Sequence, residues 1–172
     1  PEEYRSRTGF CDYYFGLKAI KTSEYPYHYR FERIQQSIDI YSKDGKSFKG
    51  SMLCWIYGGN VKYKGDWGKE YKETKVFYSL SNLDSNKAII LGNYFHEKFK
   101  FFNDTIINYP TKTEEQDANR IVVDCYSDHF WKKENDSFQE IHYHCPKLWI
   151  DRSNRAVKVM KAEQIIDSII DL

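Results

Sequence analysis

The sequence predicts a mainly all-β fold: a single antiparallel meander β-barrel of about eight strands, lipocalin-like in architecture, with a C-terminal helix. Aromatic residues, which are enriched in strands, make up 17% of the 172 residues. Many of them lie in alternating runs such as Tyr-His-Tyr-Arg-Phe-Glu-Arg at 27–33, and this two-residue period sends successive side chains to opposite faces of a strand. Turn signals separate the runs at short intervals, and closure into a barrel would remove exposed strand edges.

The first half of the chain contains most of the predicted strands. Residues 10–21 and 27–40 alternate, and Lys43-Asp44-Gly45-Lys46 then predicts a tight turn, because Asp-Gly between two β-prone runs is a strong hairpin signal. Strands are expected over 47–57, 61–67 and 71–80, with a second turn at Gly58-Gly59-Asn60. Residues 87–102 begin with consecutive apolar residues, at odd and even positions alike. This pattern predicts a strand that is buried on both faces or curved around the barrel wall.

The second half begins with a polar segment, 110–119, that is typical of an exposed loop. Strands are predicted over 120–126, 138–144 and 147–150, with a turn at Glu134-Asn135-Asp136. The chain then changes its period, because residues 160–172 place isoleucines on one helical face, at positions 165, 166, 169 and 170. This terminal helix would cap one barrel mouth or mediate formation of a homo-oligomer.

Composition limits the class of protein. A chain of this length is expected to form one domain over residues 1–172. Its 26 basic and 25 acidic residues leave a net charge of +1, which argues against a polymeric nucleic-acid ligand. No apolar run approaches the roughly 18 residues of a membrane helix. Because the chain starts at Pro1 rather than at a methionine, we expect a soluble piece of a longer protein.

The cysteines and histidines do not form a recognisable cofactor site. Four separated cysteines (Cys11, Cys54, Cys125 and Cys145) lack a C-x-x-C pair, which predicts reduced thiols in a cytoplasmic setting. His142 and His144 would share one face of a strand, as two ligands of one metal would, but no third ligand follows at a known spacing. We therefore predict no metal and no cofactor, with His142 and His144 as weak metal candidates.

Catalytic motifs are also missing. The sequence contains no G-x-S-x-G elbow, no H-E-x-x-H helix and no glycine-rich phosphate-binding loop. It predicts a non-catalytic domain. The residues between positions 27 and 78 suggest a binding site instead, since aromatic side chains there are interleaved with Arg and Lys. The aromatic rings would stack on nucleobases, and the basic side chains would neutralise phosphates. Cross-strand packing on an outer barrel face would give the same pattern.

Three segments resemble the soluble sensor domain of two-transmembrane β-barrel effectors in bacterial antiphage systems of the CBASS type. The segments are Phe31 to Ile40, the return strand with Ser47, Gly50 and Ser51, and Phe77-Tyr78-Ser79-Leu80-Ser81-Asn82. The resemblance implies an eight-stranded barrel that binds a cyclic nucleotide. It also implies two preceding membrane helices that tether this cytoplasmic domain to the inner membrane. The chain lacks a glycine-rich closing strand, and its tail from Met160 is an addition.

The main hypothesis is therefore a sensor of a cyclic di- or oligonucleotide that activates a membrane-anchored antiphage effector. In this hypothesis the ligand is stacked by aromatic residues and its phosphates are neutralised by basic ones, namely Trp55, Tyr57 and Tyr78 for stacking and Arg30, Arg33 and Lys75 for charge. Two alternatives remain open. One is a lipocalin-like carrier of an apolar small ligand, whose cavity would lack basic residues. The other is a solid-cored interaction module, such as an inhibitor or immunity protein.

Overall fold

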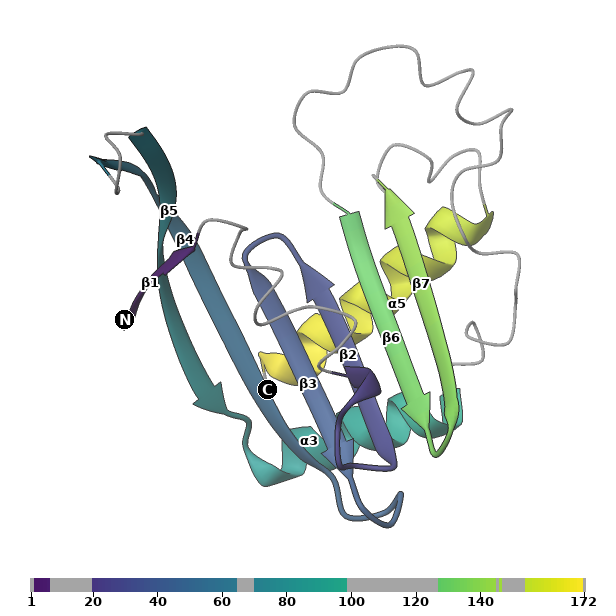
Figure 1. Ribbon diagram of the computed structural model, residues 1–172. Coiled ribbons are helices and arrows are strands. Elements are labelled where there is room, and N and C mark those ends of the chain that lie inside the picture. The colour runs from purple at the N-terminus through teal and green to yellow at the C-terminus, as the bar shows by residue number, and fades with distance from the viewer. Residues whose placement is uncertain are drawn as a thin grey trace.

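The computed structural model describes residues 2–6, 20–64, 70–98, 127–144, 146 and 154–171. Seven strands in these ranges form one antiparallel sheet, in the spatial order β1-β5-β4-β3-β2-β6-β7 (Figure 1). In chain order the strands are β1 (Glu2–Ser6), β2 (Tyr27–Arg33), β3 (Gln36–Ser42), β4 (Lys49–Lys64), β5 (Glu70–Asn82), β6 (Ser127–Glu134) and β7 (Ser137–His144). The helices are α3 (Ser85–Asn93), continued by the π-helical turn η2 (Tyr94–Lys98), and α5 (Asn154–Ile170).

Short connections join β3 to β4 and β6 to β7, and their residues suit the backbone they adopt. Gly45 has a φ of +70° in the β3–β4 connection, where the Asp44 carboxylate accepts hydrogen bonds from the backbone N–H groups of Lys46 and Ser47 at 2.8 and 2.7 Å. These bonds hold the pKa of Asp44 below its usual value. Asn135, with a φ of +52°, occupies the β6–β7 turn. The predicted turns at 43–46 and 134–136 are therefore confirmed.

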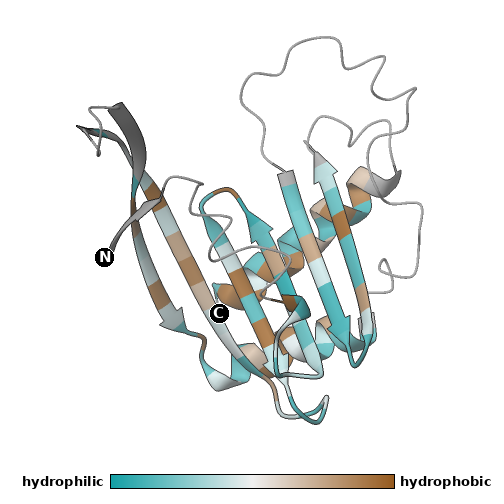
Figure 2. Cartoon of the chain, viewed as in Figure 1, coloured by the Kyte–Doolittle hydropathy of each residue, from teal (hydrophilic) through white to brown (hydrophobic). Residues whose placement is uncertain are grey.

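The main core lies between the sheet and α5, which crosses one face of the sheet (Figure 1). Alternate residues of the strands contribute to it: Tyr29 and Phe31 of β2, Ile38 and Ile40 of β3, Phe130 of β6 and Ile141 of β7. Figure 2 shows hydrophobic bands alternating with hydrophilic ones along the strands. From α5 they meet Ala156, Val159, Ala162, Ile166 and Ile169. We call this side of the sheet the helix face and the opposite side the distal face.

The distal face carries the intervening residues of the same strands. At β4 and β5 it is apolar, where Leu53, Trp55 and Val76 form a second buried cluster with Tyr78 packed against it. Toward β6 it becomes polar, although many of its side chains are buried. We call this polar part the distal cluster; it comprises His28, Arg30, Glu32, Ser37, Asp39, His129 and Trp131.

The prediction of a mainly β fold is confirmed, but the closed barrel is wrong. In the described residues β1 pairs only with β5 and β7 pairs only with β6, so the sheet is open and seven-stranded. A closed barrel of about eight strands would bury its inner face against the opposite wall, whereas here α5 packs against the helix face. The lipocalin-like architecture is not observed for the same reason.

Two further predictions in the first half are wrong. The turn expected at Gly58-Gly59-Asn60 is a β-bulge within the continuous strand β4, and Gly59 accommodates it with a φ of +92°. The strand expected over 87–102 is helix α3 and η2 as far as Lys98. The residue that marks the start of this helix in the sequence is Asp84. Its side chain caps α3 by accepting hydrogen bonds from the backbone N–H groups of Asn86 and Lys87.

The terminal helix is confirmed and is longer than predicted, since α5 begins at Asn154 rather than at 160. Along the described ranges no helix is both long and apolar enough to cross a bilayer. The strands expected over 120–126 and 147–150 and the loop at 110–119 lie outside the described residues. Of the strand expected over 10–21 only residues 20 and 21 are described, and they are helical rather than extended.

Candidate functional site

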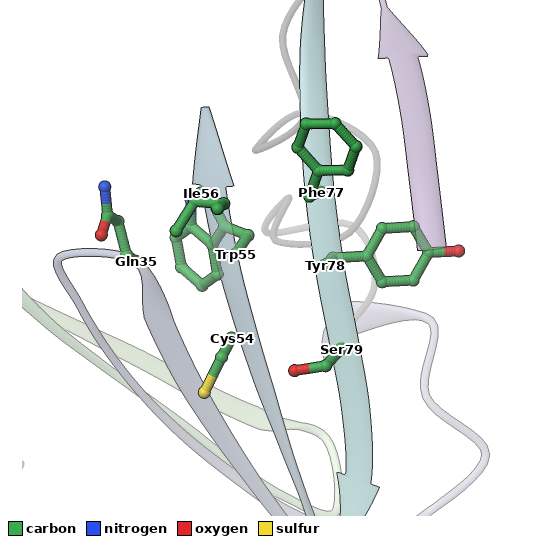
Figure 3. Close-up of a pocket in the computed structure, with 7 residues that line it drawn as sticks. All are labelled: Gln35, Cys54, Trp55, Ile56, Phe77, Tyr78 and Ser79. Atoms are coloured by element: carbon green, nitrogen blue, oxygen red, sulfur yellow. The ribbon is translucent and has the colours of Figure 1, made fainter. Parts of the chain in front are cut away.

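A pocket of about 300 Å³ opens at strands β4 and β5. It is lined by seven residues: Gln35, Cys54, Trp55, Ile56, Phe77, Tyr78 and Ser79 (Figure 3). Figure 3 shows Cys54 and Ile56 on β4, Phe77 and Ser79 on the neighbouring strand β5, and Trp55 on the far side of β4. We call this the β4–β5 pocket. Its size is at the lower end of the range of small-molecule sites.

The local backbone places these residues together. Gln35 occupies the β2–β3 turn with a φ of +59°, and its carbonyl accepts a 3.0 Å hydrogen bond from the backbone N–H of Trp55. Across the β4–β5 ladder Trp55 is opposite Tyr78, and Cys54 is opposite Ser79. One end of the pocket is therefore fixed by a turn and the other by a strand pair.

The chemistry of the pocket is mainly apolar. Three of the lining side chains are aromatic rings and one is Ile56, which is 57% exposed. None of the seven is an acid or a basic residue. Cys54 is a free thiol, in agreement with the prediction of reduced cysteines; the other three cysteines lie outside the described residues. A planar, weakly polar group fits such a lining.

Two of the six predicted ligand residues, Trp55 and Tyr78, line this pocket. Lys75 lies beside it, since its Nζ is 5.0 Å from the ring centroid of Phe77, another lining residue. Tyr57 is half exposed and follows Trp55 on the same face of β4, opposite Val76.

Arg30 lies elsewhere, in the distal cluster, and makes a buried ion pair. Its Nε and Nη2 donate to the two carboxylate oxygens of Asp39 at 2.7 and 3.1 Å. The Oδ1 of Asp39 also lies 2.8 Å from Nε2 of His28. Burial alone would raise the pKa of Asp39, but the His28 and Arg30 contacts lower it below its usual value. Arg30 therefore has a structural anion rather than a ligand phosphate as its partner.

Arg33 is also engaged, on the helix face. Its Nη2 lies 2.6 Å from Asp167 of α5, its Nη1 donates to Glu163 at 3.4 Å, and its Nε donates to Gln36 at 2.7 Å. Burial disfavours the cation, but these acidic partners raise the pKa of Arg33 above its ordinary value. Arg33 thus fastens the end of β2 to the terminal helix.

The histidines do not form a metal centre in the described ranges, where no group of three or more potential ligands is suitably placed. His142 stacks on His129 across β6 and β7, with ring centroids 4.0 Å apart and an interplanar angle of 16°. Burial and this neighbour lower the pKa of His129 to about 4. The side chain of His144, the other metal candidate, lies outside what the structure describes.

The distal cluster itself was missed by the sequence analysis. It combines the Arg30–Asp39 ion pair with Glu32, whose pKa is raised to about 7 chiefly by burial. The sequence did contain a signal for this cluster, because residues 28, 30, 32, 37 and 39 are polar and alternate with the core residues of the same strands. That pattern is usually taken as a solvated face, and only the fold shows that much of it is buried.

No family model, no curated protein and no solved structure matches this chain.

Proposed function

We propose that this chain is a non-catalytic sensor domain that binds a small ligand at the β4–β5 pocket, and that the ligand is a cyclic di- or oligonucleotide. In this proposal a nucleobase enters the pocket and stacks on Phe77, the lining ring that shares a face of the sheet with Cys54, Ile56 and Ser79. Binding would then activate a membrane-anchored antiphage effector of which this domain is the cytoplasmic part.

The observation that carries the proposal is the aromatic pocket with a cation beside it. Trp55, Phe77 and Tyr78 line the pocket, and the ammonium group of Lys75 lies over Phe77. Base stacking on aromatic side chains contributes about 1 to 3 kcal/mol per base, and a neighbouring lysine attracts a phosphate. Neither Arg30 nor Arg33 lines the pocket, whereas Lys75 lies over the lining residue Phe77, so Lys75 has the main electrostatic role in this proposal.

Calorimetric titration of the whole chain with a panel of cyclic di- and oligonucleotides tests the proposal. We expect one panel member to bind, and we expect Ser79→Trp to abolish its binding by filling the pocket. Ser81→Trp is the matched control: Ser81 is also exposed, lies on the same face of β5 and does not line the pocket. The absence of binding by any member to the folded chain would refute the proposal, as would equal binding by the Ser79→Trp variant.

A second candidate function is binding of an apolar small ligand, the carrier hypothesis in an open sheet rather than a lipocalin barrel. It is favoured by the absence of acidic and basic residues from the pocket lining. An uncharged aromatic probe such as N-phenyl-1-naphthylamine would then bind better than any nucleotide.

Lys75→Gln separates the two candidates. Because the substitution removes one positive charge beside Phe77, it should weaken a phosphate-bearing ligand several-fold and flatten the salt dependence of its affinity. It should leave the affinity of an uncharged probe unchanged. The same calorimetric titration at two salt concentrations therefore assigns the ligand class.

A further inference from the structure

The Phe77 ring of the β4–β5 pocket has one face occupied by a cation. Lys75, Phe77 and Ser79 project from the same side of β5, because residues two apart in a strand share a face. The Nζ of Lys75 lies over the ring, 5.0 Å from its centroid. A Cβ added at Gly58 would lie 2.7 Å from Cε2 of Phe77, so the ring edge packs against the bare backbone of Gly58. A stacked base therefore takes the opposite face of the ring, on the side of Ser79.

Small side chains lie below that face of the ring. Cys54 and Ser79 are opposite each other in the β4–β5 ladder, and both line the pocket. On the other side of β4, Gln36 is opposite Cys54, and the carbonyl of Gln35 accepts the 3.0 Å hydrogen bond from the backbone N–H of Trp55. Adjacent strands are about 5 Å apart, so the β2–β3 turn borders the space above Cys54 and Ser79. A flat group in that space would have one edge at Gln35.

Gln35 supplies a polar group at this edge. Its side chain is exposed, lines the pocket and makes no hydrogen bond with any described residue (Figure 3). A side-chain amide carries an oxygen acceptor next to an N–H donor. This pair matches adenine, whose N6 amino group donates and whose neighbouring N7 accepts.

The pocket is poorly suited to guanine. At the corresponding edge guanine carries two acceptors, O6 and N7, which proteins contact with Arg or Lys. None of the lining residues is basic, and Lys75 lies over the face of Phe77 away from the base. The amide oxygen of Gln35 would also face O6 with no proton between them. Hypoxanthine has the same O6 and N7 and would meet the same mismatch.

We propose that Gln35 determines the specificity of the β4–β5 pocket and that the base it selects is adenine. The ligand would then be an adenine-containing cyclic nucleotide, and this inference rests on the function proposed for the pocket. The base stacks on Phe77 above Cys54 and Ser79, while the Gln35 amide accepts from N6 and donates to N7.

Calorimetric titration of the whole chain with cyclic di- and trinucleotides of adenine, guanine and hypoxanthine tests the inference. The hypoxanthine ligands differ from the adenine ligands only in the purine ring, where oxygen replaces the N6 amino group and N1 gains a proton. We expect the adenine ligand to bind about tenfold more tightly than the guanine and hypoxanthine ligands of the same ring size. Gln35→Leu should remove this preference.

Gln35→Arg provides a reversal of specificity that a merely structural role would not produce. Because Arg pairs with O6 and N7 of guanine, the ratio of adenine to guanine affinity should fall below one in this variant. Ser81→Arg adds the same charge at an exposed position that does not line the pocket, so it is the matched control and should leave the ratio unchanged.

Two kinds of failure are distinguishable. If a guanine or hypoxanthine ligand binds as well as the adenine ligand, or if Gln35→Leu keeps the adenine preference, the role of Gln35 is overturned while the pocket remains a cyclic-nucleotide site. If no cyclic nucleotide binds to the folded chain, the specificity and the proposed function are both refuted.

Discussion

Arg30 shows how the meaning of a residue depends on its partner. The interleaving of aromatic and basic residues predicted that Arg30 would contact a phosphate. In the fold its guanidinium group instead donates twice to Asp39, which His28 also contacts. Nothing in the spacing of residues 30 and 39 specifies this pair, because it depends on the β2–β3 register set by the Ile34–Gln35 turn.

Asp39→Asn should destabilise the protein strongly. The substitution leaves the buried Arg30 guanidinium, whose side chain is 6% exposed, without its countercharge. We expect the free energy of unfolding to fall by about 3 kcal/mol in urea titrations. Asp136→Asn, at an exposed turn, is the control and should change it by less than about 0.5 kcal/mol. A loss below 1 kcal/mol for Asp39→Asn would contradict a structural role for the pair.

Glu32 and His129 are cross-strand neighbours with opposite pKa shifts. The pKa of Glu32 rises from 4.5 to about 7, so the folded state binds the extra proton and Glu32's stabilising contribution is lost as pH rises through this range. The pKa of His129 falls from 6.5 to about 4, so the unfolded state binds the extra proton and stability rises with pH. Between about pH 4.5 and 6.5 the two effects oppose each other.

Glu32→Gln should isolate the contribution of Glu32, because His129 is present in both proteins and its contribution cancels in their difference. Relative to the original chain, the variant's free energy of unfolding should increase as pH rises from 4.5 to 7. The expected increase is about 1 to 2 kcal/mol, allowing for solvent screening of these partly exposed groups. Urea unfolding of both proteins at half-unit pH steps measures this difference. A difference that is constant or that falls with pH would show that the carboxyl group of Glu32 is not shifted upward.

At the scale of elements, the hydrophobic periodicity of the C-terminal segment predicted a helix correctly but not where that helix begins. The isoleucines of the terminal helix share one face, and α5 is indeed a helix whose Ile166 and Ile169 are buried in the main core. Helix α3 was mistaken for a strand because Ile89, Ile90 and Leu91 are consecutive apolar residues, a pattern typical of buried strands. Only Leu91 of the three is buried, and its partners, which include Phe48, are distant in sequence.

Gly92 of α3 provides a test of this helix packing. A Cβ added at Gly92 would collide with the ring of Phe48. Gly92→Ala should therefore lower the free energy of unfolding by about 1 to 3 kcal/mol, although alanine is the better helix former. Asn93→Ala, at the exposed neighbouring position, should be neutral or slightly stabilising. Thermal unfolding of the two variants and the original chain measures these differences. A Gly92→Ala variant more stable than the original chain would mean that α3 does not pack on Phe48.

At the scale of the whole molecule, the sequence was enough to predict a mainly β fold, but not whether the sheet closes into a barrel or stays open. Alternation identifies the two faces of each strand, but a barrel and a helix-covered open sheet produce the same alternation. The difference lies in what covers the helix face, and here α5 provides that cover. Two of the predicted ligand residues, Trp55 and Tyr78, line one pocket and Lys75 lies beside it, whereas Arg30 and Arg33 form ion pairs on β2.

Binding of the proposed ligand to the β4–β5 pocket is the central claim, and Cys54 reports on it directly. Its thiol lines the pocket and is free. The measurement is the rate at which iodoacetamide alkylates Cys54, followed by peptide mass spectrometry with and without a saturating cyclic nucleotide from the calorimetric panel. We predict that the ligand slows alkylation of Cys54 several-fold, and that it has no effect on this rate in the Ser79→Trp variant. A ligand that binds by calorimetry yet leaves the Cys54 rate unchanged would contradict the claim.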